Sequence, residues 1–198
     1  MIDKPEAVIY GSIAAIVISL FFIGTGITGY AVTSNVSGVV NVTIETAAAL
    51  NFTTNLLDFG AGAITGGAVN ATLDSESTTT SWSGPGTAGE LVLENIGNVD
   101  VSLTLSTNKT VANFIGGSSP SFKAKTADTT GNSGACSGAV ELFDGSYFEI
   151  NTTPQVACTV FGYADAADEI DIDFEIVIPS DATGAKTVGI IAIGTYTP

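Results

Sequence analysis

The chain has 198 residues and a mass of 20.0 kDa, enough for one ordinary domain and a short additional segment. Its formal net charge is −15, from 20 acidic residues against 5 lysines, and it contains no arginine and no histidine. This composition excludes catalytic and zinc sites built on imidazole, and it argues against nucleic acid as a partner, because basic side chains neutralise phosphates.

The N-terminal part is a long apolar segment. Residues Ala7–Val32 run for 26 positions without a charged side chain. As a helix this segment measures about 39 Å, more than the ~30 Å hydrocarbon core of a bilayer. We predict a cytoplasmic stub at 1–6, with Lys4 setting the orientation, a transmembrane helix at 7–32 and an extracellular domain at 33–198. The alternative is a signal peptide cleaved after the small-residue motif Gly29–Ala31.

Small side chains recur every four residues along this predicted helix. Such a stripe lets two helices approach closely, and it predicts self-association of the chain in a membrane or in the core of a filament. Residues 24–29 also match the G-x-G-x-x-G pattern, but without the preceding strand that a nucleotide site needs, so we interpret them as the helix end. The residues of the stripe are Ala7, Gly11, Ala15 and Ser19.

Beyond residue 36 the hydrophobic period changes to two, which is typical of strands. Val40, Val42 and Ile44 alternate with polar residues, and the isoleucines of Ile170–Ile178 alternate with acids. We expect turns at Asn95–Asn98 and Pro179–Lys186, each joining a hairpin. The pattern predicts an all-β fold, an antiparallel β-sandwich of the Ig-like or jelly-roll kind, preceded by the one hydrophobic helix. The other predicted strands are Leu50–Thr53, Ala68–Leu73, Glu90–Glu94, Val99–Ser106, Tyr147–Asn151, Ala157–Tyr163 and Thr187–Tyr196.

Two covalent modifications are predicted for an exported domain. Cys136 and Cys158 are the only cysteines, and outside the cell we expect them to form a disulfide. Six N-x-[ST] sequons predict glycosylation, provided that the host has the machinery and the asparagines are exposed. These asparagines are Asn35, Asn41, Asn51, Asn70, Asn108 and Asn151.

The acidic strand is the one charged cluster that suggests a ligand. Asp171, Asp173 and Glu175 share one strand face, where carboxylates can frame calcium, although no calcium-loop motif accompanies them. The alternative is a solvated face that keeps the protein soluble. The single tryptophan, Trp82, is interpreted as a core anchor or as a platform for a sugar ring. No other cofactor is expected.

An apolar N-terminal helix followed by a histidine-free, sequon-bearing domain resembles archaeal exported cell-surface and pilin-like proteins. Residues Leu91–Val101 are similar to a strand–turn–strand hairpin of Ig-like modules and of fibre-forming proteins of the TasA kind, and Ile176–Gly184 resembles their closing hairpin. The resemblance implies an Ig-like or TasA-like sandwich on the cell surface, and it transfers no functional residue.

Three functional hypotheses follow. The first is a non-enzymatic cell-surface protein, structural or adhesive, anchored in the membrane by its N-terminal helix and displaying a glycosylated sandwich to an unidentified external partner. The second is a pilin-like or strand-exchanging subunit of an extracellular filament, in which a strand near Val36–Ile44 completes the sheet of a neighbour. The third is a surface module that binds calcium or glycan.

Overall fold

The computed structural model describes residues 41–76, 79–86, 89–138 and 145–196. The chain divides into two compact units, residues 1–43 and 44–198, and the described strands belong to the second. The predicted stub, the helix predicted at 7–32 with its small-residue stripe, and Asn35 lie outside the described residues. Within the described ranges, no helix is both long and apolar enough to span a bilayer.

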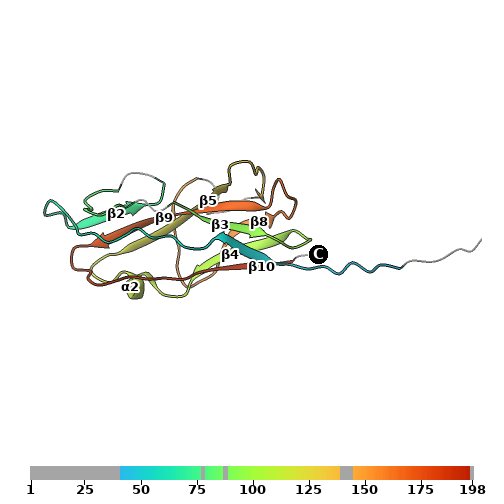
Figure 1. The fold of residues 1–198 in the computed structure, drawn as a ribbon. Coiled ribbons are helices and arrows are strands. Elements are labelled where there is room, and N and C mark those ends of the chain that lie inside the picture. The colour runs from blue at the N-terminus through green and yellow to red at the C-terminus, as the bar shows by residue number, and fades with distance from the viewer. Residues whose placement is uncertain (1–40, 77–78, 87–88, 139–144, 197–198) are drawn as a thin grey trace, which may run out of the picture. The chain divides into compact units, whose positions relative to one another are not determined.

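The described strands form two antiparallel sheets (Figure 1). One sheet has six strands, with β1, β3, β9, β5 and β7 as successive neighbours and β2 paired to β9, and the other has four, in the order β10, β4, β8 and β6. An all-β antiparallel fold is therefore confirmed. The six-stranded sheet comprises β1 (Leu50–Thr54), β2 (Asn70–Asp74), β3 (Leu91–Asn95), β5 (Ser121–Asp128), β7 (Phe148–Glu149) and β9 (Glu169–Pro179). The four-stranded sheet comprises β4 (Val101–Thr107), β6 (Cys136–Ser137), β8 (Gln155–Phe161) and β10 (Ile190–Thr195), and the short helix α2 (Val111–Phe114) follows β4.

Strand β9 organises the larger sheet, because β2, β3 and β5 all pair with it. Its alternation is the one predicted: Ile170 and Ile172 are fully buried, whereas Glu175 on the opposite face is partly exposed. The long apolar row on one face explains why β9 lies at the centre of the sheet, where both edges are paired and one face is covered.

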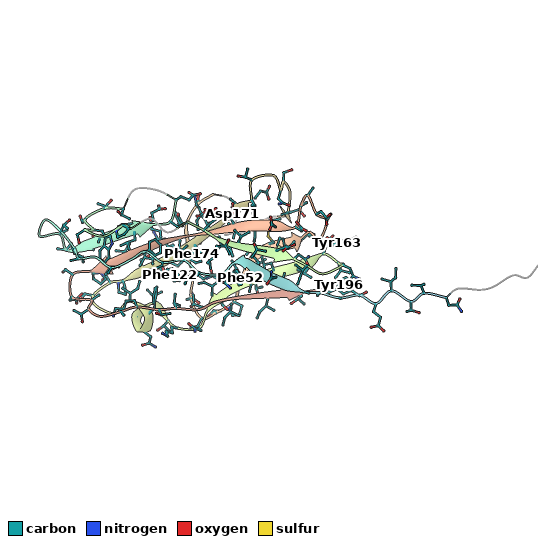
Figure 2. All side chains as sticks on the ribbon, viewed as in Figure 1. Phe52, Phe122, Tyr163, Asp171, Phe174 and Tyr196 are labelled. Carbon is teal, nitrogen blue, oxygen red and sulfur yellow. A yellow bond between two sulfur atoms is a disulfide. The ribbon has the colours of Figure 1, made fainter. Side chains whose placement is uncertain are left out.

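The hydrophobic core lies between the two sheets. Phe174 of β9 stacks on Phe122 of β5 at a centroid distance of 5.3 Å, and Phe114 of α2 meets Phe122 edge-on at 5.1 Å. Leu103 and Leu105 of β4 complete the core from the four-stranded sheet and are fully buried. Figure 2 labels Phe122 and Phe174, which are buried, and Phe52 of β1, which is partly buried and packs against the core.

Both predicted hairpins are wrong. Strands β3 and β4 belong to different sheets, so the turn at Asn95–Asn98 carries the chain from one sheet to the other. Asn95 fixes this crossing: it is 1% exposed, and its Nδ2 donates hydrogen bonds to two backbone carbonyl oxygens at 3.0 and 3.2 Å. Strands β9 and β10 likewise lie in different sheets. Because the chain crosses between the sheets, β3 and β4 contribute to the shared core from opposite sides, and so do β9 and β10.

Two other differences concern single strands. Strand β5 was not predicted, because its inward residues after Phe122 are Ala124 and Thr126, which give a weak apolar signal. Of the strand predicted from Val40 to Ile44, the structure describes residues 41–44, and residues 41–49 take part in no strand.

Candidate functional site: an apolar groove and an unpaired segment

The two cysteines form the predicted disulfide. Cys136 of β6 and Cys158 of β8 are bonded, with their Cα atoms 5.3 Å apart. Within the described residues β6 is two residues long and pairs with β8 alone, so the bond fastens an edge strand that has little pairing of its own. Its role is structural.

Five of the six predicted glycosylation sites lie among the described residues. Asn41, Asn51, Asn70 and Asn108 are exposed, and Asn151 is half-buried. The Oδ1 atom of Asn108 accepts a hydrogen bond from the backbone N–H of Gly189 at 2.8 Å. Glycosylation itself stays a prediction.

Each acid of the predicted calcium cluster has a different partner. Asp171 accepts a hydrogen bond from the Thr129 hydroxyl at 3.0 Å, Asp173 accepts one from the Ser75 hydroxyl at 2.8 Å, and Glu175 accepts one from Lys123 Nζ at 2.8 Å. Across the described residues, no group of three or more acids or cysteines is arranged to hold a metal ion. Asp171 is labelled in Figure 2.

Asp173 is buried beneath the chain that follows β2. It is 2% exposed, and this burial raises the pKa of its carboxyl group to about 7. Glu76 raises the pKa further, by its charge and by a hydrogen bond, whereas the Ser75 hydroxyl and Lys125 lower it. Lys125 forms an ion pair with Glu76 and lies 5.0 Å from the ring centroid of Tyr147. We interpret this cluster as a structural clasp between the Ser75 segment and β9.

The second unit has an apolar groove of about 1370 Å³. Its floor comes from the inner face of the six-stranded sheet and from α2, and includes Phe122, Phe174 and Ile176, which are already buried. Half-buried apolar side chains supply the surface that a ligand can still cover. These are Leu57, Phe59, Ile178, Val188 and Ile190.

Two irregular segments form the walls of this groove. One is the chain at 55–64, between β1 and β2, and the other is the chain at 182–190, which leads into β10 and runs past α2 in Figure 1. In the described ranges, residues 56–58 and 183–188 make no backbone–backbone hydrogen bond. Leu56 on the rim is 77% exposed. The walls therefore offer peptide groups as well as apolar side chains.

Trp82 lines this groove, and it is partly buried and packed against the hydrophobic core. Its ring packs against the backbone of Gly62, where a Cβ would overlap the ring, and its Nε1 is buried without a hydrogen-bond partner in the described chain. A sugar platform needs an open ring face, and this ring is only partly exposed.

The segment before β1 has the opposite character, because it exposes apolar side chains. Val42 is 76% exposed and Ile44 is 83% exposed. In the described residues 41–49 the side-chain anchor lies at the C-terminal end: Asn98 Oδ1 accepts from the N–H of Ala47 at 2.7 Å, and Asn98 Nδ2 donates to the carbonyl of Glu45 at 2.8 Å. The alternation is visible in the sequence, whereas this anchor is not.

No family model matches the sequence, and neither a curated protein nor a solved structure matches it at a significant level.

Proposed function

We propose that this chain is a non-enzymatic structural protein of the cell surface whose copies assemble into a filament by donating a strand. The donor is the segment at 36–45 of one copy, and the acceptor is the apolar groove of the next copy. The observation that carries the proposal is that an exposed alternating segment and an incompletely filled groove occur on one chain.

The chemistry of the two parts is complementary. Val36, Val40, Val42 and Ile44 occupy even positions, so in an extended strand they share one face. That face would cover the half-buried apolar side chains of the groove, while its backbone pairs with the peptide groups of the walls. Main-chain hydrogen bonds then supply affinity, and the alternate side chains supply register.

Chain length keeps Ile44 away from the far end of the groove of its own copy, so Ile44 can meet that end only in another copy. The turn that anchors Ala47 is fixed beside Asp168, whose carbonyl accepts from the Asn95 N–H at 2.9 Å. Ile178 lies ten residues further along, at the other end of β9, roughly 33 Å away. Ile44 precedes Ala47 by three residues and reaches about 10 Å.

The single tryptophan provides a local assay for this proposal. A donor variant of the full chain, Val42→Lys with Ile44→Lys, is purified in mild detergent and titrated with a peptide of residues 36–47. Because Trp82 lines the groove, we expect a saturable change in its fluorescence. A peptide carrying the same two lysines is the control and should leave the emission unchanged.

The outcome separates strand donation from simple stickiness. A response to the native peptide alone supports the groove as the acceptor. No response to either peptide, or equal responses to both, would contradict strand donation into this groove.

A further inference from the structure

Charge is divided very unevenly between the two sheets. The strands of the six-stranded sheet carry ten charged side chains, whereas the sequences of β4, β6, β8 and β10 contain none. The whole chain has a net charge of −15. The outer face of the four-stranded sheet is therefore an uncharged surface on a strongly acidic protein.

The strand register gives the composition of that face. Leu103 and Leu105 of β4 are fully buried, so Thr104 between them points outward. Thr104 is paired with Ile193 of β10 on one side and with Val156 of β8 on the other. Ile193 and Val156 are each 46% exposed, so this row is β-branched and open to solvent across three strands.

Two further apolar side chains of this sheet are exposed, although Ser106 of β4 beside one of them is buried. Ile191, next to Ser106, is 41% exposed, and Val160, next to Ser137, is 39% exposed. Together with Ile193, Thr104 and Val156, these side chains form what we call the neutral face. None of the predicted sequon asparagines lies in the four strands that form it.

The edge of this sheet lacks the usual protection as well. In the described chain β10 is hydrogen-bonded to β4 alone, so its other edge has no strand partner, although Leu50 of β1 lies close to Gly194. Proteins commonly protect such edges with charged side chains, prolines or bulges, because an open edge invites pairing. Residues Ile190–Thr195 contain no charge and no proline. An uncharged face beside an unprotected edge is typical of a surface that is covered in the assembled state.

We propose that the neutral face docks against the neutral face of a second copy of this chain. Two such sheets stack about 10 Å apart, with isoleucine and valine rows from both copies excluding water. The occupant is a like copy because two chains of charge −15 repel wherever their acids oppose each other, and this face has no acid to oppose. A cationic partner would bind the acids of the six-stranded sheet.

The contact is two-fold symmetric and uses none of the donor residues. It would join chains side by side, whereas strand donation joins them end to end. Each contact can therefore fail without the other.

The experiment uses the full-length donor variant in detergent, so that strand donation is removed, and measures its molar mass by sedimentation over a range of concentrations. We expect a reversible dimer. Adding Ile193→Lys should weaken dimerisation about tenfold or more, because a desolvated charge then lies in the contact. The control is Val177→Lys on the outer face of β9, which changes net charge equally and should leave dimerisation intact.

Each of the two lysine substitutions reduces the net negative charge of the chain and so weakens the general repulsion between copies. If Ile193→Lys alone lowers the affinity of the dimer, that loss is therefore specific to the neutral face. Val156→Lys tests the same face from β8, and Thr104→Lys, at a polar position, replaces either variant that fails to fold. A donor variant that stays monomeric at all concentrations would overturn the proposal. A dimer that persists after substitutions at the neutral face also overturns the proposal. Association through the predicted helix would give this second result.

Discussion

The exposed segment allows a quantitative prediction for the donor variant. Val42 and Ile44 are 76% and 83% exposed in the free chain, so insertion into a groove can remove most of their surface from water. Full burial of such a side chain contributes about 1.5–3 kcal/mol. Scaled by the exposed fractions, the two residues contribute about 3 kcal/mol together, which corresponds to roughly a hundredfold in the dissociation constant.

The variant Val42→Lys/Ile44→Lys should therefore weaken end-to-end association by about a hundredfold, and more if the ammonium groups are desolvated. The matched control is Thr43→Lys, which lies between them on the opposite face of the strand. Both proteins are produced without glycans, because the control removes the Asn41 sequon. Filament mass is measured by light scattering and electron microscopy.

Equal loss of filaments in the variant and in the control would refute the alternating-face argument. Filaments that form normally in the donor variant would refute strand donation altogether.

Three further predictions concern the stability of the fold. Replacing Cys136 and Cys158 by alanine should lower the free energy of unfolding by about 3 kcal/mol in urea titrations, because a 22-residue loop is no longer closed; an unchanged midpoint would contradict a structural role. Asp173→Asn should raise Tm at pH 8 and flatten its pH dependence. The native carboxyl, with a pKa of about 7 against an ordinary 3.8, retains a proton that the unfolded chain releases, so native stability falls as pH rises from about 4 to 7. A variant whose Tm keeps the original pH profile would refute this. Asn98→Ala should remove two hydrogen bonds, at roughly 1 kcal/mol each, and accelerate exchange of the Ala47 amide; unchanged exchange would show that the anchor is unimportant.

Local periodicity allowed part of the fold to be predicted. The alternation along Ile170–Ile178 identified both the buried face and the acidic face of β9, because a strand's side-chain period does not depend on its neighbours. The disulfide was also predictable, since only two cysteines exist. Neither signal depends on knowing the tertiary structure.

Strand partners were not predictable, because a turn of suitable composition does not decide whether the next strand stays in the sheet. Asn95 illustrates this: its amide bonds to Val99 and Phe161 hold the chain as it crosses between sheets, and Phe161 is distant in sequence. The groove was missed for the same reason. Its walls are irregular segments that meet only in the folded chain, whereas the donor alternation was visible at Val42 and Ile44.

Mixing two complementary variants, each also carrying Ile193→Lys to remove the neutral-face contact, tests the central claim most directly. The donor variant lacks its strand but retains its groove, whereas Ala61→Trp/Ala185→Trp blocks the groove from both walls and leaves the donor segment unchanged. Strand donation predicts that neither protein forms filaments alone and that an equimolar mixture gives a discrete one-to-one complex in native mass spectrometry. Absence of that complex, or filament growth by the groove-blocked protein alone, would contradict the account.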